Sequence, residues 1–331
     1  MRTAEQILKI QDLQTYFYSR KGVAKAVDGV SFGLNAGEVL GVVGESGCGK
    51  SVTAQSVMQL VPQPPGKIVG GSIRFKDQEL LDLSPAQMRK VRGAGIAMIF
   101  QEPMTSLNPV YTIGDQLAEM FRLHKGMGKK QALEAAVEML ARVQIPSPQK
   151  RVHEYPHQLS GGMRQRAMIA MALSCDPEVL IADEPTTALD VTVQAQILDL
   201  MLRLKEEFNT AVQLITHDLG VIAETADQVV VMYAGQVVEQ APTRELFSHT
   251  LHPYTQGLLN SIPVLGHRTQ NRDAEPLSEI KGMIPSLYDL PTCCRFFNRC
   301  PQCMDICKTQ APQLEDQGNA HAVRCWLHNR K

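Results

Sequence analysis

A glycine-rich loop that ends in lysine and serine lies early in the chain. Residues Gly44–Ser51 fit the pattern G-x-x-x-x-G-K-[ST] and stand between the apolar run Val39–Val43 and a helical pattern. Such glycines let backbone N–H groups wrap phosphate oxygens, and the start of the helix adds positive potential. We expect Lys50 to reach the β- and γ-phosphates of a nucleotide and Ser51 to bind Mg²⁺. The predicted nucleotide-binding residues of this phosphate loop are Gly44, Glu45, Ser46, Gly47, Cys48, Gly49, Lys50 and Ser51.

Two carboxylates follow a second apolar run. Val179–Ala182 predicts a buried strand, and Asp183 and Glu184 come directly after it. In a chain with a phosphate loop, the acidic residue at such a strand end holds Mg²⁺, which fits Asp183. Glu184 is then placed to polarise an attacking water as a general base. The pair predicts hydrolysis of a nucleotide phosphate.

A serine followed by two glycines is a second candidate for phosphate binding. Ser160, Gly161 and Gly162 precede an expected helix from Met163, whose start would present free N–H groups and positive potential. The whole string Leu159–Arg166 reads L-S-G-G-M-R-Q-R, and through it the chain resembles the ATP-binding subunits of ABC transporters. In that family two cassettes enclose two ATP molecules. The resemblance implies that Ser160, Gly161, Gly162 and Gln165 act on ATP held by a partner chain.

Single positions elsewhere match motifs of the same family. Gln101 resembles the glutamine that senses Mg²⁺ and contacts the membrane subunit, and His217 resembles the histidine that contacts the γ-phosphate. Asp190, in the string Ala188–Asp190, resembles the D-loop aspartate. Phe17 aligns with the aromatic residue that stacks on adenine, although Tyr16 and Tyr18 adjoin it. The implied ligands are ATP and Mg²⁺, the latter through Ser51, Gln101 and Asp183.

Two further segments narrow the resemblance. His252–Thr255 reads H-P-Y-T, and Gln101–Pro109 reads Q-E-P-M-T-S-L-N-P. Both resemble the ATPase subunits of dipeptide, oligopeptide and nickel importers, in particular the D type. This implies a subunit that hydrolyses ATP to power import of peptides or related solutes at the cytoplasmic face of the inner membrane. The implied partners are a second, homologous ATPase chain in a heterodimer, two transmembrane permease subunits and, indirectly, an extracytoplasmic solute-binding protein.

Cysteines are concentrated near the C-terminus. Six of the eight cysteines lie between residues 293 and 325, a clustering that in a reducing cytosol points to metal or redox chemistry. The spacing is neither that of a zinc ribbon nor that of a ferredoxin. Iron–sulfur, zinc and free thiols therefore stay open on the residues alone, and Cys293 and Cys303 could compete as ligands. The resemblance implies a [4Fe–4S] cluster held by Cys294, Cys300, Cys307 and Cys325.

The elements that must position these residues alternate between strands and helices. Further strands are expected at Ile96–Phe100, Val212–Thr216 and Val229–Tyr233, with helices at Lys50–Leu60, Val191–Phe208 and Leu219–Ala226. This alternation predicts an α/β fold with a largely parallel sheet covered by helices. Leu8–Phe17 and Ala24–Leu34 predict antiparallel strands, whereas Ile113–His124 and Lys130–Val143 predict amphipathic helices.

The expected architecture is a P-loop NTPase cassette of the ABC type. It combines a mixed sheet core with an antiparallel β subdomain and an inserted helical subdomain. We expect residues 1–108 and 161–250 to form the ATPase core, residues 109–160 the helical subdomain, and residues 251–331 an irregular, cysteine-rich extension. Gly266–Glu279 is expected to be a linker. Gly282–Lys331 has few apolar residues, so its order should depend on a metal or another staple, separately from the phosphate loop.

Composition limits the function. The 331 residues carry 33 Lys+Arg and 34 Asp+Glu, a balance that argues against nucleic-acid binding. Apolar runs are too short to span a bilayer, and the first residues lack a signal-peptide pattern, so we expect a cytoplasmic chain whose membrane role comes through partners. A cytosolic ATPase for iron–sulfur assembly is an alternative, against which the H-P-Y-T segment argues. A translation or DNA-repair ABC protein fits less well, because this chain has one signature string and no basic patch.

Overall fold

The computed structural model describes residues 5–101, 106–187, 189–262 and 279–329. The chain divides into two compact units. The first unit comprises Met1–Leu8, Gly33–Val39 and Arg74–Ile215, and the second comprises Lys9–Phe32, Leu40–Ile73 and Thr216–Lys331. The phosphate loop therefore belongs to the second unit, whereas the predicted catalytic carboxylates belong to the first.

The second unit contains a mixed sheet. Strand β3 (Val39–Val43) pairs in parallel with β9 (Gln228–Tyr233), and β9 pairs in the antiparallel direction with β10 (Gln236–Pro242). The C-terminal strands β12 (Ala322–Val323) and β11 (Glu315–Asp316) extend the sheet beyond β10. All of β3 is buried, as expected of an apolar strand covered on both faces. Among its described residues, this unit has the helices α1 (Lys50–Val57), α9 (Leu219–Thr225), α10 (Thr243–Ser248) and α11 (Pro253–Asn260).

A four-stranded sheet has the order β2-β1-β4-β5. Its strands are β1 (Gln6–Ser19), β2 (Gly22–Asn35), β4 (Gly66–Phe75) and β5 (Gln78–Glu79). The sequence predicts β1 and β2 but not β4, because Gly70 and Gly71 interrupt the apolar pattern of that strand. Gly71 has φ +97°, and a Cβ atom there would lie 2.6 Å from the Cα atom of Leu13. The close approach of the two backbones therefore requires glycine.

Three parallel strands run through the first unit. Strand β7 (Val179–Asp183) pairs with β6 (Ile96–Ile99) and with β8 (Ala211–Ile215), and both pairings are parallel. Helices α2 (Pro85–Val91), α7 (Gly161–Leu173) and α8 (Val191–Phe208) belong to the same unit. The apolar runs of the sequence predict these strands closely, and the predicted helix over Val191–Phe208 has the bounds of α8.

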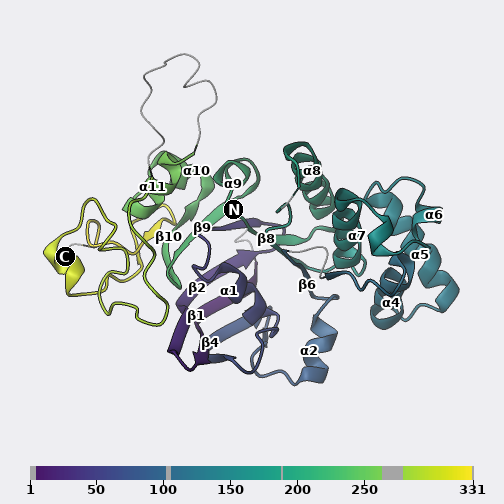
Figure 1. Ribbon diagram of the computed structural model, residues 1–331, viewed down its shortest axis with the longest axis horizontal. Coiled ribbons are helices and arrows are strands. Elements are labelled where there is room, and N and C mark those ends of the chain that lie inside the picture. Colours follow the sequence, from purple (N-terminus) through teal and green to yellow (C-terminus); the bar gives the residue numbers. More distant parts are fainter. Residues whose placement is uncertain (1–4, 102–105, 188, 263–278, 330–331) are drawn as a thin grey trace, which may run out of the picture. The chain divides into compact units, whose positions relative to one another are not determined.

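The segment predicted to be helical forms α4 (Ile113–Lys125), α5 (Lys129–Arg142), α6 (Pro148–Arg151) and the 3₁₀ helix η1 (Pro156–Gln158). Thr112 caps the start of α4 by accepting a hydrogen bond from the N–H of Asp115, and Gly126 ends the helix with φ 65°. Helices α4 and α5 pack against each other and both contact α7 (Figure 1).

The C-terminal segment 279–329 consists mostly of loops, with one 3₁₀ helix, η2 (Asp305–Lys308). Backbone and side-chain contacts anchor it. Strand β12 pairs with β10, and Nε2 of His321 lies 2.8 Å from Oε1 of the fully buried Glu239. The anchoring partners lie in the mixed sheet, which composition alone does not reveal. Of the predicted linker Gly266–Glu279, only Glu279 is within the described residues.

None of the helices formed by the described residues has the length and apolar character that a bilayer crossing requires.

Candidate functional site

The phosphate loop has a backbone that only glycine can follow. Gly44 has φ +148° and Gly49 has φ +106°. A Cβ atom at Gly44 would lie 2.2 Å from the carbonyl oxygen of Met232, and one at Gly49 would lie 2.3 Å from that of Ala26. Both approaches are shorter than any tolerable contact, so these two positions exclude larger residues. The loop is thus already shaped between β3 and α1.

The side chain of Lys50 folds back onto the loop and binds its backbone. This side chain is buried, and Nζ donates hydrogen bonds to the carbonyl oxygens of Gly44 at 2.7 Å and Glu45 at 3.2 Å. Cys48 is buried beside it, and burial raises the pKa of its thiol. A neutral, enclosed thiol is poorly reactive, which favours a packing role for Cys48 over a redox role. Ser46 and Gly47, at the tip of the loop, are exposed, while Ser51 is half-buried at the start of α1.

The aromatic residues near Phe17 differ in what holds them. Tyr16 donates a hydrogen bond of 2.6 Å to Asp28, and burial together with this bond raises the pKa of Tyr16 to about 12. The ring of Phe17 is half-buried beside Gly66, and Tyr18 is exposed. The hydrogen bond to Asp28 therefore holds Tyr16 in place within the fold. Phe17 and Tyr18 are the remaining candidates to stack on a nucleotide base.

The first unit brings Gln101 and Glu184 together. Nε2 of Gln101 donates to Oε2 of Glu184 at 3.0 Å, and the hydroxyl of Thr187 donates to the same oxygen at 2.9 Å. Glu184 has φ 47°, a left-handed backbone that is uncommon outside glycine, and its N–H bonds to the carbonyl oxygen of Ile215. Strain of this kind clusters at functional sites. Asp183, one residue earlier, is buried at the end of β7.

The predicted signature segment opens α7. Ser160 is the N-cap residue and accepts a hydrogen bond of 3.4 Å from the N–H of Met163, so the helix begins at Gly161, two residues earlier than expected. Ser160 and Gly161 are exposed and Gly162 is half-buried. The side chain of Gln165 is instead buried and donates to the carbonyl oxygen of Pro185, just beyond Glu184. This bond ties α7 to the segment that follows β7.

Two other predicted residues stand at helix starts or strand ends. Asp190 is exposed and caps α8 by accepting a hydrogen bond of 3.0 Å from the N–H of Val193. Ala188, two residues before Asp190, lies outside the described residues, as do the four residues after Gln101. His217 is exposed in the second unit, directly after Thr216, whose N–H bonds to the carbonyl oxygen of Val42 in β3.

The H-P-Y-T segment reaches the phosphate loop. His252 caps α11 by accepting a hydrogen bond from the N–H of Tyr254, and burial lowers the pKa of this histidine to about 4. The hydroxyl of Tyr254 accepts a hydrogen bond of 2.8 Å from the N–H of Glu45. The residues of this segment carry no local signal for the contact with the loop, because Tyr254 and Glu45 are 209 residues apart.

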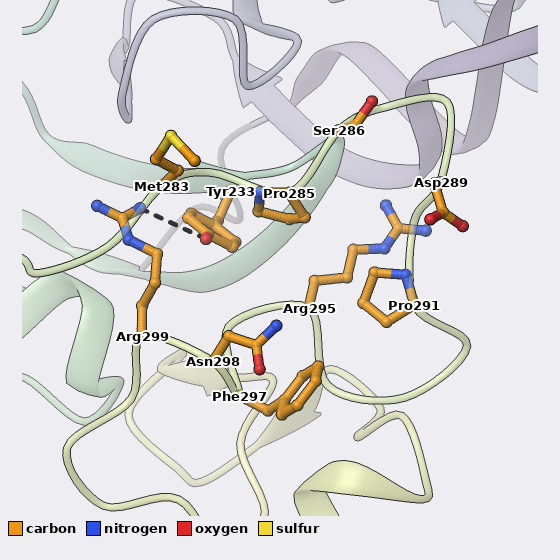
Figure 2. A pocket seen from close by; sticks show the side chains of 10 residues that line it. All are labelled: Tyr233, Met283, Pro285, Ser286, Asp289, Pro291, Arg295, Phe297, Asn298 and Arg299. Carbon is orange, nitrogen blue, oxygen red and sulfur yellow. Dashed lines mark hydrogen bonds between the residues drawn. The ribbon is translucent and has the colours of Figure 1, made fainter.

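Arg299 makes a second contact with the phosphate loop that the sequence does not predict. Its guanidinium forms two hydrogen bonds with the carboxylate of Glu45, at 2.6 and 2.9 Å, and another of 3.4 Å with the hydroxyl of Tyr233. Arg299 and Arg295 line a cavity of about 310 Å³. Figure 2 shows Arg299 on the side of Tyr233. Arg295 pairs with Asp28 in β2. The C-terminal segment therefore contacts the phosphate loop directly.

All eight cysteines are within the described residues, and all are free. Burial, and after it the nearby thiols of Cys307, Cys325 and Cys300, raise the pKa of Cys294 to about 12. Cys300 and Cys307 act on Cys325 in the same way. The four predicted ligands thus share one neighbourhood. Across the described ranges, however, no three His, Cys, Asp or Glu side chains are arranged to hold a metal ion.

Comparison with family descriptions gives two matches. Residues 27–187 match the family described as ABC transporter, and residues 238–307 match the C-terminal region of oligopeptide/dipeptide transporters.

Comparison with curated proteins gives similarity along nearly the whole chain. A probable peptide ABC transporter ATP-binding protein of Sinorhizobium fredii is 53% identical over 98% of this chain and 96% of its own length. An oligopeptide transport ATP-binding protein of Bacillus subtilis is 52% identical, with 97% of each chain covered. A dipeptide transport ATP-binding protein of the same organism is 49% identical over 99% of this chain and 96% of its own.

Solved structures agree on the fold. The dimeric ATP-binding cassette MJ0796, bound to ADP and phosphate, superimposes with a TM-score of 0.64 at 26% identity and covers 72% of this chain and 99% of its own. CbiO1 from Clostridium perfringens, part of the ABC transporter complex cbiONQ, gives a TM-score of 0.62 at 26% identity, over 74% and 92% of the two chains. The predicted P-loop cassette fold is confirmed.

Proposed function

The chain belongs to the ATP-binding subunits of ABC transporters, and from this membership we propose that it hydrolyses ATP to drive the import of peptides. The observation that carries the peptide assignment is the match of residues 238–307 to the C-terminal region of oligopeptide/dipeptide transporters. The relatives named for peptide, oligopeptide and dipeptide transport support it over the whole chain. The family resemblance predicted from the sequence motifs is confirmed, and the ATPase assignment follows from it.

ATP would bind at the phosphate loop. The backbone N–H groups of Gly44–Ser51 and the start of α1 would hold its phosphates, and Lys50 would exchange its bonds to the loop carbonyls for bonds to phosphate oxygens. Phe17 is the proposed partner of the adenine ring. Mg²⁺, when bound, neutralises charge on the β- and γ-phosphates. Ser51, Gln101 and Asp183 would hold it, and their hydroxyl, amide and carboxylate oxygens are the donors that Mg²⁺ prefers.

Glu184 is the proposed general base. Its carboxylate would orient and polarise the attacking water, while His217 would contact the γ-phosphate. Without nucleotide, Oε2 of Glu184 already accepts hydrogen bonds from Gln101 and Thr187. We infer that Gln101 must turn from Glu184 toward the nucleotide before the water can take that place. This exchange would couple hydrolysis to the segment after Gln101, where the permease is expected to dock.

The proposed assembly contains a second, homologous ATPase chain. The exposed start of α7, with Ser160, Gly161 and Gly162, would meet ATP held by that partner, and Asp190 would lie in the same interface. Gln165, buried against Pro185, would act by holding α7 to the strand end rather than by touching the partner's ATP. Two permease subunits would bind near Gln101–Asn108 and the helical segment, placing the chain at the cytoplasmic membrane face.

The same proposal divides the chain by role. Residues 1–108 and 161–250 would form the ATPase core, residues 109–160 the helical subdomain that meets the permeases, and residues 251–331 the extension typical of peptide importers. A solute-binding protein would deliver peptide outside the membrane, without touching this chain.

We also propose that Cys294, Cys300, Cys307 and Cys325 hold a [4Fe–4S] cluster with a structural role. Four free thiols in one neighbourhood supply the thiolate set that such a cluster needs. Each ligand must lose its proton when the cluster binds.

Co-purification in detergent tests the function. The tagged chain is expected to bring down two permeases and a second ATPase chain, and ATP hydrolysis by the reconstituted complex should rise when a peptide-loaded binding protein is added. The Lys50→Ala variant should assemble in the same complex without the rise. Recovery with soluble iron–sulfur assembly proteins and no permease would contradict the assignment.

A further inference from the structure

We propose that Arg299 and Tyr254 are positioning residues of the phosphate loop, Arg299 by neutralising the carboxylate of Glu45 and Tyr254 by fixing its backbone N–H. The inference rests on the proposed binding of ATP at this loop. It assigns to the C-terminal extension a direct part in preparing the nucleotide site, through two side chains that act on one loop residue.

Glu45 is an acidic residue in a loop that is proposed to receive a triphosphate. It directly follows Gly44, so it brings a negative charge into the segment whose N–H groups are proposed to bind the phosphates. Two negative charges close together repel each other, and the repulsion is stronger where water is partly excluded. An unpaired Glu45 would therefore weaken binding of ATP. A neutralising partner removes this cost without removing the backbone N–H groups that bind phosphate.

Arg299 provides that partner in a fixed geometry. Its side chain is only 4% exposed, and both terminal nitrogens bond to the two oxygens of Glu45. The remaining donors are also used, since the guanidinium donates to Tyr233 and to the carbonyl oxygens of Ile280 and Lys281. A bidentate pair with its other donors occupied holds the carboxylate in one orientation. Glu45 is therefore drawn toward the C-terminal segment.

Tyr254 holds the same loop residue from its backbone. The hydroxyl oxygen that accepts from the N–H of Glu45 belongs to a fully buried ring. That ring packs against Tyr233, with ring centres 4.7 Å apart, and against Phe296, with centres 5.5 Å apart. Phe296 comes from the same C-terminal segment as Arg299. The aromatic cluster thus fixes the position of the Tyr254 hydroxyl. The hydrogen bond to this hydroxyl then fixes the N–H of Glu45.

Arg295 offers a matched control. It lies in the same segment and forms a comparable ion pair, with Asp28, and it also donates to the carbonyl oxygen of Ala234. Its carboxylate partner is in β2 rather than in the phosphate loop. Loss of Arg295 would remove an anchor of the extension without exposing a charge beside the phosphates. The two arginines thus separate a structural effect from an electrostatic one.

The test is ATP affinity of the full-length chain, measured by calorimetry for a set of variants. Arg299→Gln should weaken ATP binding about tenfold, because the free carboxylate then faces the phosphates. The double variant Glu45→Gln/Arg299→Gln should recover most of that loss, although it restores no ion pair. Arg295→Gln should change affinity less than twofold. In the assembled transporter, Arg299→Gln should raise KM for ATP far more than it lowers kcat.

Two further variants cover the case in which Arg299→Gln does not fold. Arg299→Lys keeps the charge but loses the bidentate geometry and should give an intermediate affinity. Tyr254→Phe removes only the acceptor for the N–H of Glu45 and should weaken binding about threefold. Equal affinity for Arg299→Gln and the unchanged chain would overturn the inference. So would a double variant as weak as Arg299→Gln alone. Failure of the unchanged chain to bind ATP would overturn the proposed function as well.

Discussion

Two helix starts in this chain are expected to meet phosphate, and they are built in opposite ways. The start of α1 is enclosed: glycines with positive φ shape it, Lys50 closes it, and Tyr254 and Arg299 hold it from the C-terminal extension. The start of α7 is open, with Ser160 and Gly161 exposed and only the Ser160 hydroxyl capping it. The first is shaped by contacts within this chain, whereas the second has its opening residues exposed, as a site completed by a partner should.

The largest expected effect of a substitution is on ATP turnover, and it arises at Glu184 rather than at either helix start. Glu184→Gln keeps the side-chain volume and removes the general base, so turnover of the assembled complex should fall about 10²- to 10⁴-fold while ATP still binds. Glu178→Gln is the control, because that half-buried carboxylate precedes the same strand and pairs with Lys76 rather than with a site residue. Steady-state ATP hydrolysis and ATP binding, measured on the same preparations, test whether turnover falls while binding persists. Near-normal turnover in Glu184→Gln would remove this residue from the chemistry.

The next effect tests the enclosed helix start. Lys50→Ala removes the amine that now bonds to Gly44 and Glu45 and is expected to bond to phosphate. Affinity of the isolated chain for ATP should fall about 10²-fold, since hydrogen bonds to charged groups contribute about 1.5–3 kcal/mol. The exposed residue Lys9 gives the control variant Lys9→Ala. Tight ATP binding by Lys50→Ala would show that the loop is not the nucleotide site.

A carboxylate at the open helix start should affect association rather than binding by the isolated chain. Gly162→Asp would face the γ-phosphate of the partner's ATP, so ATP-driven dimerisation should weaken about tenfold. A Cβ atom at Gly162 would lie 3.1 Å from Val193, so Gly162→Ala measures the steric part. Gly128→Asp adds the same charge at the exposed N-cap of α5. Equal loss of ATP binding by the isolated Gly162→Asp chain would contradict a role in trans.

The contrast also marks what the sequence can predict. The loop Gly44–Ser51 and the strand before it are local features: a continuous apolar run, glycines at defined positions and a following helix. Their structure follows from neighbours in the chain, and β3 has the predicted bounds Val39–Val43. The capped start of α7 is local in the same sense, because Ser160 and Met163 are only three residues apart.

The contacts that position the phosphate loop come from residues far away in the sequence. Glu45 and Arg299 are 254 residues apart, and Glu45 and Tyr254 are 209 apart. Nothing in the residues around Arg299 distinguishes it from Arg295, and only the folded chain assigns each its carboxylate. The pairing of β12 with β10 escapes prediction for the same reason, because two residues of strand carry no periodic signal.

The smallest expected effect asks whether the enclosed helix start depends on the cysteines. Arg299 directly precedes Cys300, so loss of the proposed cluster should loosen the backbone that carries the guanidinium. Cys300→Ser should therefore lower the iron content of protein purified without oxygen and make residues 282–331 sensitive to protease. ATP affinity should fall about threefold, less than in Arg299→Gln, because the bidentate pair persists part of the time. Cys303→Ser, outside the proposed ligand set, is the control.

The combination of these readouts separates the possible links between the two regions. If iron is lost and the ATP affinity falls, adding Glu45→Gln should restore the affinity without restoring iron, since the defect is then a free carboxylate. If iron is lost and the affinity is unchanged, the anchors at Glu239 and Asp28 hold Arg299 in place without a cluster. Zinc in place of iron would refute the cluster but keep a metal staple. A metal-free segment that still resists protease would show that these ion pairs and the β12–β10 pairing are enough to order it.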